Sequence, residues 1–181
     1  MKKTTPISKP YSEEEGDILD LILEDHKPLK LLIKVLKDSE KYSIEERRDA
    51  FEDFAPLLAI HSKPEETSLY LYMKEYDELK VEGYEGEVEH GLAEQLINEI
   101  LETENEDLWS ARVKVLAEMV EHHIEEEEEV MFPDIRKNSE LEERAKLGTL
   151  YMQLKTQFDA EGDFRPINQV SDAYIEHHMQ H

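Results

Sequence analysis

Two segments of the chain repeat one arrangement of side chains that can bind a metal ion. The segments are "HSKPEETSLY", residues 61–70, and "HIEEEEEVMF", residues 123–132, and both fit the pattern H-x-x-x-E-E-x-x-[LM]-[YF]. Residues four apart lie one turn apart on the same face of a helix. His61 and Glu65 would therefore stand side by side, and so would His123 and Glu127. Imidazole and carboxylate ligands, in a chain without cysteine, suit iron, manganese or zinc.

Apolar residues at helical spacing predict that both pairs face a protein core. The two stripes step by three or four residues through Phe51, Phe54, Leu58, Leu69 and Tyr72, and through Val113, Leu116, Val120 and Val130. A stripe through His122 would instead carry Glu126 and Glu129 and would be wetter. We therefore expect His123 to point inward and His122 to flank the site.

Two more histidines lie on predicted core stripes. His26 falls between Ile22 and Leu29, and His90 shares a predicted face with Glu94, Ile97 and Leu101. A four-helix bundle points such stripes inward. The sequence therefore predicts four histidines and two or three glutamates in one core layer.

A bound cation explains this polar layer better than a core without a metal ion does. A buried carboxylate without a partner costs several kcal/mol, and a bound metal ion removes that cost. Other known metal motifs fit less well. The E-x-x-H motif of ferritin-like di-iron proteins occurs only at Glu87–His90, and the H-E-x-x-H motif of zinc proteases is missing from the sequence.

Composition favours one helical domain and disfavours several classes of partner. The chain has 181 residues, only six glycines and seven prolines, and many good helix formers. Its 45 acidic and 21 basic side chains give a formal charge of −24, which repels nucleic acid and anionic lipid. Residues 1–16 lack the apolar stretch of a signal peptide, and no apolar run is long enough for a membrane span. We expect a cytoplasmic protein.

The pattern predicts an all-α fold: an up-down-up-down four-helix bundle with one or two additional C-terminal helices. We expect a flexible tail over residues 1–12, the bundle over 13–137, and a helical extension packed on it over 138–181. The bundle helices are predicted at about 13–37, 44–76, 87–102 and 107–132. Ser43 is the expected N-cap of the second helix, and Pro56 and Pro64 should kink or break it. "VEGYEGEVE" reads as the loop before the third helix, Pro133 as the end of the fourth, and the extension as helices at 139–158 and 167–181.

These segments resemble the hemerythrin-like family, also called the HHE cation-binding domain. The matching stretches are "EDHKPLKLL", "HSKPEETSLY", "EHGLAEQLINEIL" and "HHIEEEEEVMFPDI", within about residues 15–135. The resemblance implies a non-haem centre of two iron ions with an oxo, hydroxo or water bridge. It also implies two kinds of ligand: terminal histidines and bridging carboxylates. The ligands would be His26, His61, His90 and His123, bridged by Glu65 and Glu127.

One position departs from the oxygen carriers of that family. They place a second histidine four residues after a ligand on the third helix, whereas this chain has Glu94 four residues after His90. The pattern is similar to a six-ligand branch, with Glu94 either a seventh ligand or a glutamate at the rim. Simple oxygen carriage is therefore in doubt.

Three functions stay open at this point. The first is binding of O2 or NO at an open iron position for storage, delivery or sensing. The second is an oxidoreductase acting on peroxide or NO, and the third is an iron-responsive sensor. Whether the protein is an enzyme, and its oligomeric state, do not follow from the sequence. The histidines of the final segment, His177, His178 and His181, are expected to lie on an exposed end.

Overall fold

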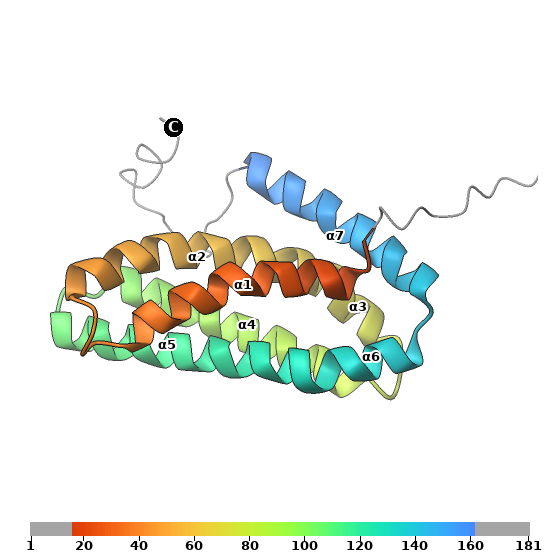
Figure 1. The fold of residues 1–181 in the computed structure, drawn as a ribbon, viewed down its shortest axis with the longest axis horizontal. Coiled ribbons are helices and arrows are strands. Elements are labelled where there is room, and N and C mark those ends of the chain that lie inside the picture. The colour runs from red at the N-terminus through yellow and green to blue at the C-terminus, as the bar shows by residue number, and fades with distance from the viewer. Residues whose placement is uncertain (1–15, 162–181) are drawn as a thin grey trace, which may run out of the picture.

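The described part of the protein is all-α. The computed structural model describes residues 16–161, with side chains through Phe158. Its helices are α1 (Ile18–Lys37), α2 (Ile44–Thr67), α3 (Leu69–Met73), α4 (Lys80–Leu101), α5 (Glu106–Glu126), a π-helical turn η1 (Glu127–Met131), α6 (Phe132–Asn138) and α7 (Leu141–Glu161). The four long helices α1, α2, α4 and α5 run side by side as an up-down-up-down bundle (Figure 1). The predicted fold class is confirmed.

Side-chain caps start three of the bundle helices. Ser43 is the N-cap of α2, as expected: it accepts a hydrogen bond from the amide of Glu46, and Glu46 accepts one from the amide of Ser43, which together form a capping box. Asp17 caps α1 and Asn105 caps α5 in the same way. These caps satisfy backbone donors that the helix itself leaves free.

The second helix passes through both of its prolines, so neither proline breaks it. Pro56 and Pro64 both lie inside α2, and the chain stays helical to Thr67. The break comes at Ser68, whose hydroxyl donates to the carbonyl of Pro64 at 2.6 Å. Each proline removes one backbone hydrogen bond, and the packing of the neighbouring turns is sufficient to keep the helix together.

The third helix starts earlier than predicted. α4 begins at Lys80 and contains the segment expected to be a loop, including Gly83 and Gly86. Both glycines face α3: Gly83 lies against Met73 and the backbone oxygen of Tyr70, and Gly86 lies against the Tyr70 ring. The glycines are thus there for close packing rather than for a turn. α4 also buries Ala93 and Ile100 in place of the predicted Glu94 and Leu101.

A π-helical turn changes the register at the end of the fourth helix. Val130, expected on the buried stripe, is 53% exposed, whereas Met131 is 6% exposed. In η1 the backbone bonds span five residues, so one extra residue enters the turn and the inward face moves along by one position. Pro133 does not end the helical path, because it occupies the first turn of α6, where no backbone N–H is needed.

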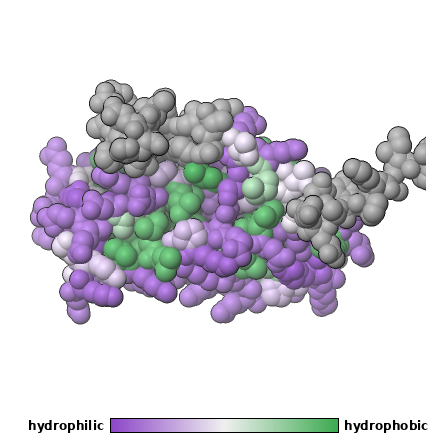
Figure 2. All heavy atoms as spheres, turned by 45° about the horizontal axis from the view of Figure 1, so that its top comes forward, coloured by the Kyte–Doolittle hydropathy of each residue, from purple (hydrophilic) through white to green (hydrophobic). Residues whose placement is uncertain are grey.

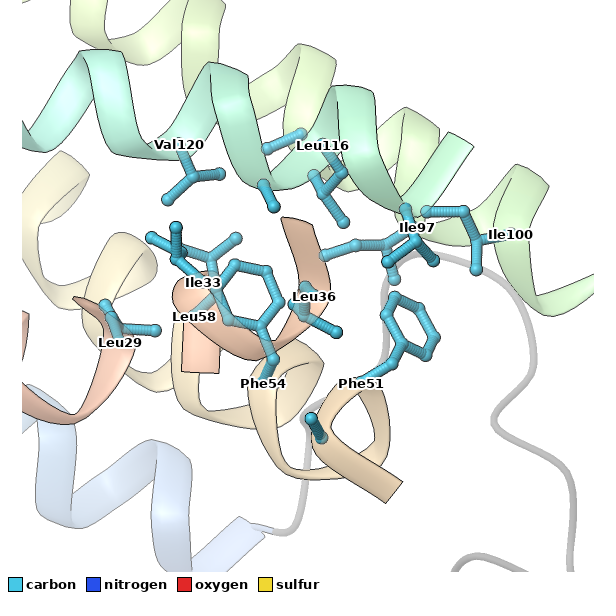
Figure 3. Close-up of a cluster of buried hydrophobic side chains, with 14 of the residues drawn as sticks. Leu29, Ile33, Leu36, Phe51, Phe54, Leu58, Ile97, Ile100, Leu116 and Val120 are labelled. Atoms are coloured by element: carbon cyan, nitrogen blue, oxygen red, sulfur yellow. The ribbon is translucent and has the colours of Figure 1, made fainter. Parts of the chain in front are cut away.

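Two apolar clusters fill the bundle on either side of one polar layer. The first cluster, drawn in Figure 3, includes Leu29 of α1, Leu58 of α2, Ile97 of α4 and Val120 of α5. The second includes Ile22, Leu69 and Phe132 together with Tyr151 of α7. Along α1, α2 and α5 the chain passes from one cluster to the other through a histidine. The polar layer is therefore sealed by hydrophobic packing at both ends.

α7 covers the outside of the bundle. It packs against α1 and α2 and lies obliquely across them (Figure 1). Figure 2 shows that hydrophilic side chains dominate one face of the molecule, with hydrophobic side chains in separate patches. Within residues 16–161 no helix is long and apolar enough to cross a membrane. The predicted N-terminal tail up to residue 12 and the predicted helix over 167–181 lie outside the described residues.

The packing of Tyr70 against α4 gives a test with an internal control. A Cβ at position 86 would lie 2.6 Å from the Tyr70 ring, so Gly86→Ala should destabilise the protein by about 1–3 kcal/mol. Gly91 is exposed on the same helix and has no atom within 4 Å of such a Cβ, so Gly91→Ala should stabilise by up to about 1 kcal/mol. Urea unfolding of both variants measures these changes. Equal effects at the two positions would contradict the packing described.

Candidate metal site

Six histidine and glutamate side chains meet in the polar layer of the bundle. They come from all four long helices and the π-helical turn: His26 from α1, His61 and Glu65 from α2, His90 from α4, His123 from α5 and Glu127 from the first position of η1. None is more than 5% exposed. The structure thus brings together all six residues that the sequence singled out.

The inner atoms of these residues approach one another closely. His26 Nε2 lies 3.2 Å from Glu127 Oε2, and His123 Nε2 lies 3.6 Å from Glu127 Oε1. His61 Nε2 and His90 Nε2 lie 3.4 and 3.8 Å from Glu65 Oε2. Three sets of three residues offer ligand atoms within 4.8 Å of one another: His26, His61 and Glu127; His61, Glu65 and His90; and Glu65, His123 and Glu127. Each glutamate therefore lies between two histidines.

Most of these inner atoms have no hydrogen-bond partner. The unpartnered atoms include both carboxylate oxygens of Glu65, Oε2 of Glu127, and Nε2 of His26, His61 and His90. Buried polar atoms are nearly always paired, because leaving one unpaired costs about 1–3 kcal/mol and more for a charged group. Six such atoms facing one interior space fit a cation that they would all contact. Their N and O donors are the types that iron, manganese and zinc accept.

The two glutamates are electrostatically unequal. Burial, together with the negative charge of Glu127, raises the pKa of Glu65 well above its ordinary value. Burial also acts on Glu127, but His123, His26 and His61 outweigh it, so the pKa of Glu127 falls below its ordinary value. Without metal, Glu65 therefore holds a proton more readily than an ordinary glutamate, and Glu127 holds one less readily. Metal ions next to both would displace the Glu65 proton.

The pKa values of the histidines are also shifted in different directions. Burial lowers the pKa of His61 and of His90, and neighbouring histidines lower it further. For His123, Glu127 and Glu89 outweigh burial and raise the pKa. A neutral imidazole has a free lone pair, which is the form that binds metals. His61 and His90 thus have that form before any ion arrives.

Three of the four histidines have a carboxylate at their outer ring nitrogen. Glu128 faces Nδ1 of His26 at 2.9 Å, and Glu89 faces Nδ1 of His123 at 2.6 Å. Glu66 lies 3.3 Å from Nδ1 of His90, a longer approach in which that nitrogen makes no hydrogen bond. A carboxylate there holds the proton on Nδ1 and leaves Nε2 free to bind a metal. None of these three glutamates was predicted as part of the site, although Glu66 and Glu128 are the second glutamates of the repeated H-x-x-x-E-E pattern.

The fourth histidine has a different neighbour. Nδ1 of His61 faces the hydroxyl of Tyr151, in α7, at 3.5 Å, and that hydroxyl donates to Asp25 at 2.5 Å. Lys155 in turn lies 2.5 Å from the same Asp25 oxygen. The sequence around His61 does not indicate a contact with Tyr151, because the two residues are 90 positions apart in the chain.

Tyr70 of α3, the last residue of the first repeat, also enters the site. Its hydroxyl donates to Glu127 Oε1 at 2.7 Å and lies 3.3 Å from His123 Nε2. Burial and the nearby carboxylates raise its pKa, so it keeps its proton. Phe132, the matching residue of the second repeat, stacks on His26 and has no hydroxyl. The repeat therefore places a proton donor on one side only.

The histidines form two pairs across the layer. The ring centroids of His26 and His61 are 5.1 Å apart, and those of His90 and His123 are 4.7 Å apart. We call these the first pair and the second pair. The two glutamates lie between the pairs, since each is close to one histidine of α2 or α5 and to one of another helix.

A small cavity lies beside the second pair. It is lined by His90, His123, Ala93 and apolar side chains of α2 and α5, and its volume is about 10 Å³. That volume holds about one water molecule. Beside the first pair, the position three residues after His26 carries the fully buried Leu29, where the second pair has Ala93. The smaller side chain leaves room next to His90 and His123.

Several other predicted candidates lie away from the cluster. Oε2 of Glu94 accepts a hydrogen bond from Nζ of Lys63 at 2.9 Å. Glu94 belongs to none of the three sets of ligand atoms found among the described residues. His122 is 74% exposed at its side chain, so the choice of His123 as the inward residue is confirmed. His177, His178 and His181 lie outside the described residues.

The sequence of this domain matches one known family model. The model describes the hemerythrin HHE cation binding domain and covers residues 17–135. This range includes all six clustered residues and ends before α7 begins. Comparison with curated proteins and with solved structures gave no match.

The unequal glutamates predict a pH dependence in the metal-free protein. Between 4.5 and its raised folded-state pKa, Glu65 keeps a proton that the unfolded chain releases, so stability is lost as pH rises through this range. The Gln side chain of Glu65→Gln cannot titrate, so this variant should not lose stability in that way. Its free energy of unfolding should therefore increase relative to that of wild type as pH rises. Glu127→Gln should destabilise the metal-free protein, because it replaces a carboxylate held by Tyr70 and two histidines.

The measurement is chemical unfolding of chelator-treated protein between pH 5 and 8. Glu126→Gln is the matched control, because Glu126 is adjacent in sequence and 39% exposed beside His122. Its unfolding should follow wild type at every pH. If the Glu65→Gln and wild-type curves ran parallel, the assignment of a buried neutral Glu65 would be wrong.

Proposed function

The chain belongs to the hemerythrin HHE cation-binding family, and we propose on that premise that the buried cluster holds two iron ions. Its ligands would be His26, His61, His90 and His123, with Glu65 and Glu127 shared between the ions. This is the ligand set of a six-ligand branch. One observation carries the proposal: six buried polar atoms of these residues face one interior space without a partner.

Two ions fit the arrangement better than one. The histidines form two separate pairs, and each glutamate lies close to one histidine of each pair. A single ion would leave one pair of imidazoles and part of a carboxylate buried and unsatisfied. An oxo, hydroxo or water bridge would complete the pair of ions, as the family resemblance implies.

The bound ions would supply Lewis-acid and redox chemistry toward a diatomic ligand. We propose that the protein binds O2 or NO in this way, for storage, delivery or sensing. The chain contributes a sealed apolar surrounding, a cavity of about 10 Å³ beside His90 and His123, and a hydroxyl donor in Tyr70. The cavity has room for one small molecule and not for an organic substrate. A cytoplasmic location is part of the proposal and is supported only by the sequence features given above.

A second candidate is an oxidoreductase that decomposes peroxide. The observation in its favour is Tyr70, which keeps its proton and lies 2.7 Å from Glu127 in the same layer. A positioned proton donor is typical of general acid catalysis. Peroxide loss that is catalysed by iron-loaded wild type and strongly reduced in Tyr70→Phe would favour the enzyme, whereas reversible ligand binding without peroxide loss would favour the binding protein.

Metal content tests the assignment of the ligands. Iron-loaded wild type should contain two ions per chain, and His123→Ala should lose at least one, because it removes a donor that contacts the shared Glu127. His122→Ala is the control, since its side chain is 74% exposed one residue away. Elemental analysis gives the ratio, and thermal unfolding with and without iron gives the linked stability, about 4 kcal/mol when free metal is a thousandfold above Kd. Equal losses in both variants would contradict the register.

The cavity gives a separate test of ligand access. Ala93→Val should fill the space beside the second pair and lower affinity for NO by about tenfold or more, while the metal content stays at the wild-type value. Leu29→Ala, at the matching position beside the first pair, should not lower that affinity, although it should cost about 2–5 kcal/mol of stability. Optical titration with NO measures both. If Ala93→Val bound NO as wild type does, the ligand would not use this cavity.

A further inference from the structure

The site has an approximate internal twofold relation. Besides the differences at Tyr70 and Ala93, this relation fails where α7 meets the site. The repeat relates His61 to His123, Glu65 to Glu127 and Glu66 to Glu128. The relation extends to the other two helices, because Glu66 faces His90 and Glu128 faces His26. It therefore exchanges the first pair of histidines with the second.

The failure concerns the residues that precede the histidines of α1 and α4. Glu89 precedes His90 and places its carboxylate 2.6 Å from Nδ1 of His123 on the neighbouring helix. Asp25 precedes His26 and is the matching residue for His61. Asp25 does not reach His61 directly, because the hydroxyl of Tyr151 lies between them, 2.5 Å from Asp25 and 3.5 Å from His61 Nδ1. α7 thus inserts one side chain into a site otherwise built by the four bundle helices.

The proton positions along this chain follow from the donors available. Tyr151 has one proton, and the short contact assigns it to Asp25, so the hydroxyl oxygen is left to accept from His61 Nδ1–H. Lys155 lies 2.6 and 2.5 Å from the two Asp25 oxygens and balances their charge. His61 is therefore backed by a long bond to a neutral hydroxyl, whereas His123 is backed by a short bond to a carboxylate.

We propose that Tyr151 is a positioning residue that makes the two halves of the site unequal, so that the ion beside His26 and His61 binds more weakly. This inference rests on the proposed di-metal function. A carboxylate on the outer nitrogen raises the basicity of a histidine ligand and fixes its ring, and a neutral hydroxyl at longer distance does both less well. The two ions then load in order, first beside His90 and His123 and then beside His26 and His61.

The same geometry gives α7 a role in the site. α7 lies beyond residues 17–135, the part that matches the family model. It packs on α1 and α2, the two helices that carry the first pair, and it contacts the cluster through Tyr151. An element added to the bundle thereby controls one ion, while the ion next to the cavity keeps the carboxylate support of Glu89.

Titration of the metal-free protein with Co²⁺, followed by calorimetry and visible absorption, tests the proposal. Wild type should bind two ions in resolved steps. Tyr151→Phe keeps the ring but removes the acceptor for His61, so it should weaken the second step by about 10–100-fold and leave the first unchanged. Glu89→Gln should weaken the first step instead. Tyr84→Phe is the matched control, because Tyr84 is 50% exposed on the outside of α4, and it should change neither step.

A spectroscopic readout separates positioning from a loss of structure. At one equivalent of Co²⁺, the hyperfine-shifted ring protons of wild type should belong to His90 and His123, and those of His26 and His61 should appear only at the second. This measurement on wild type decides the loading order even if Tyr151→Phe folds poorly. Shifted signals from His26 and His61 first, equal steps in wild type, or two unchanged steps in Tyr151→Phe would overturn the role of Tyr151. If wild type bound no Co²⁺, the proposed di-metal function itself would fail.

Discussion

The structure depends on two glutamates that are buried between two apolar clusters. Glu65 and Glu127 are both fully buried, and their carboxylates face the same interior space. Two negative charges cannot share a dry core without compensation. Without metal, the burial that raises the pKa of Glu65 favours its protonated form, and Glu127 is held by the Tyr70 hydroxyl and by His123, whose pKa is raised. Cations in the same space would replace that arrangement with direct bonds. In both arrangements, the apolar side chains packed around the layer keep water away from it.

Two irregularities of the helical backbone lie next to this layer, one in each repeat. After Glu65 the helix breaks at Ser68, and after His123 it widens into the π-helical turn that begins at Glu127. Both changes rotate the following residues, so that Tyr70 and Phe132 turn back over the histidines of neighbouring helices. If both helices continued without interruption, the rings of Tyr70 and Phe132 would point in other directions. The space for Tyr70 comes from Gly86 on α4, where any Cβ would touch the ring.

The sequence alone predicted the parts of the site that obey local periodicity. A spacing of four between histidine and glutamate, set on apolar stripes, was enough to place His61 and His123 inside and His122 outside, and to predict four helices. The failures were of a different kind. The start of α4, the exposure of Val130 and the hydrogen bonds of Tyr151 depend on contacts between segments far apart in the chain. Spacing carries no information about such contacts, whereas the second glutamate of each repeat was a local signal that we did not use.

The repeat explains why departures from symmetry matter. Two copies of one motif would by themselves produce two equivalent halves, with equal support for each histidine pair. Three side chains remove that equivalence: Tyr70 has a hydroxyl where Phe132 has none, Ala93 leaves space where Leu29 fills it, and Tyr151 separates His61 from Asp25. The first two place a proton donor and a cavity beside His90 and His123. The third gives His61 a neutral hydroxyl where His123 has a carboxylate. All three differences favour the side of His90 and His123 for the ligand binding that we propose.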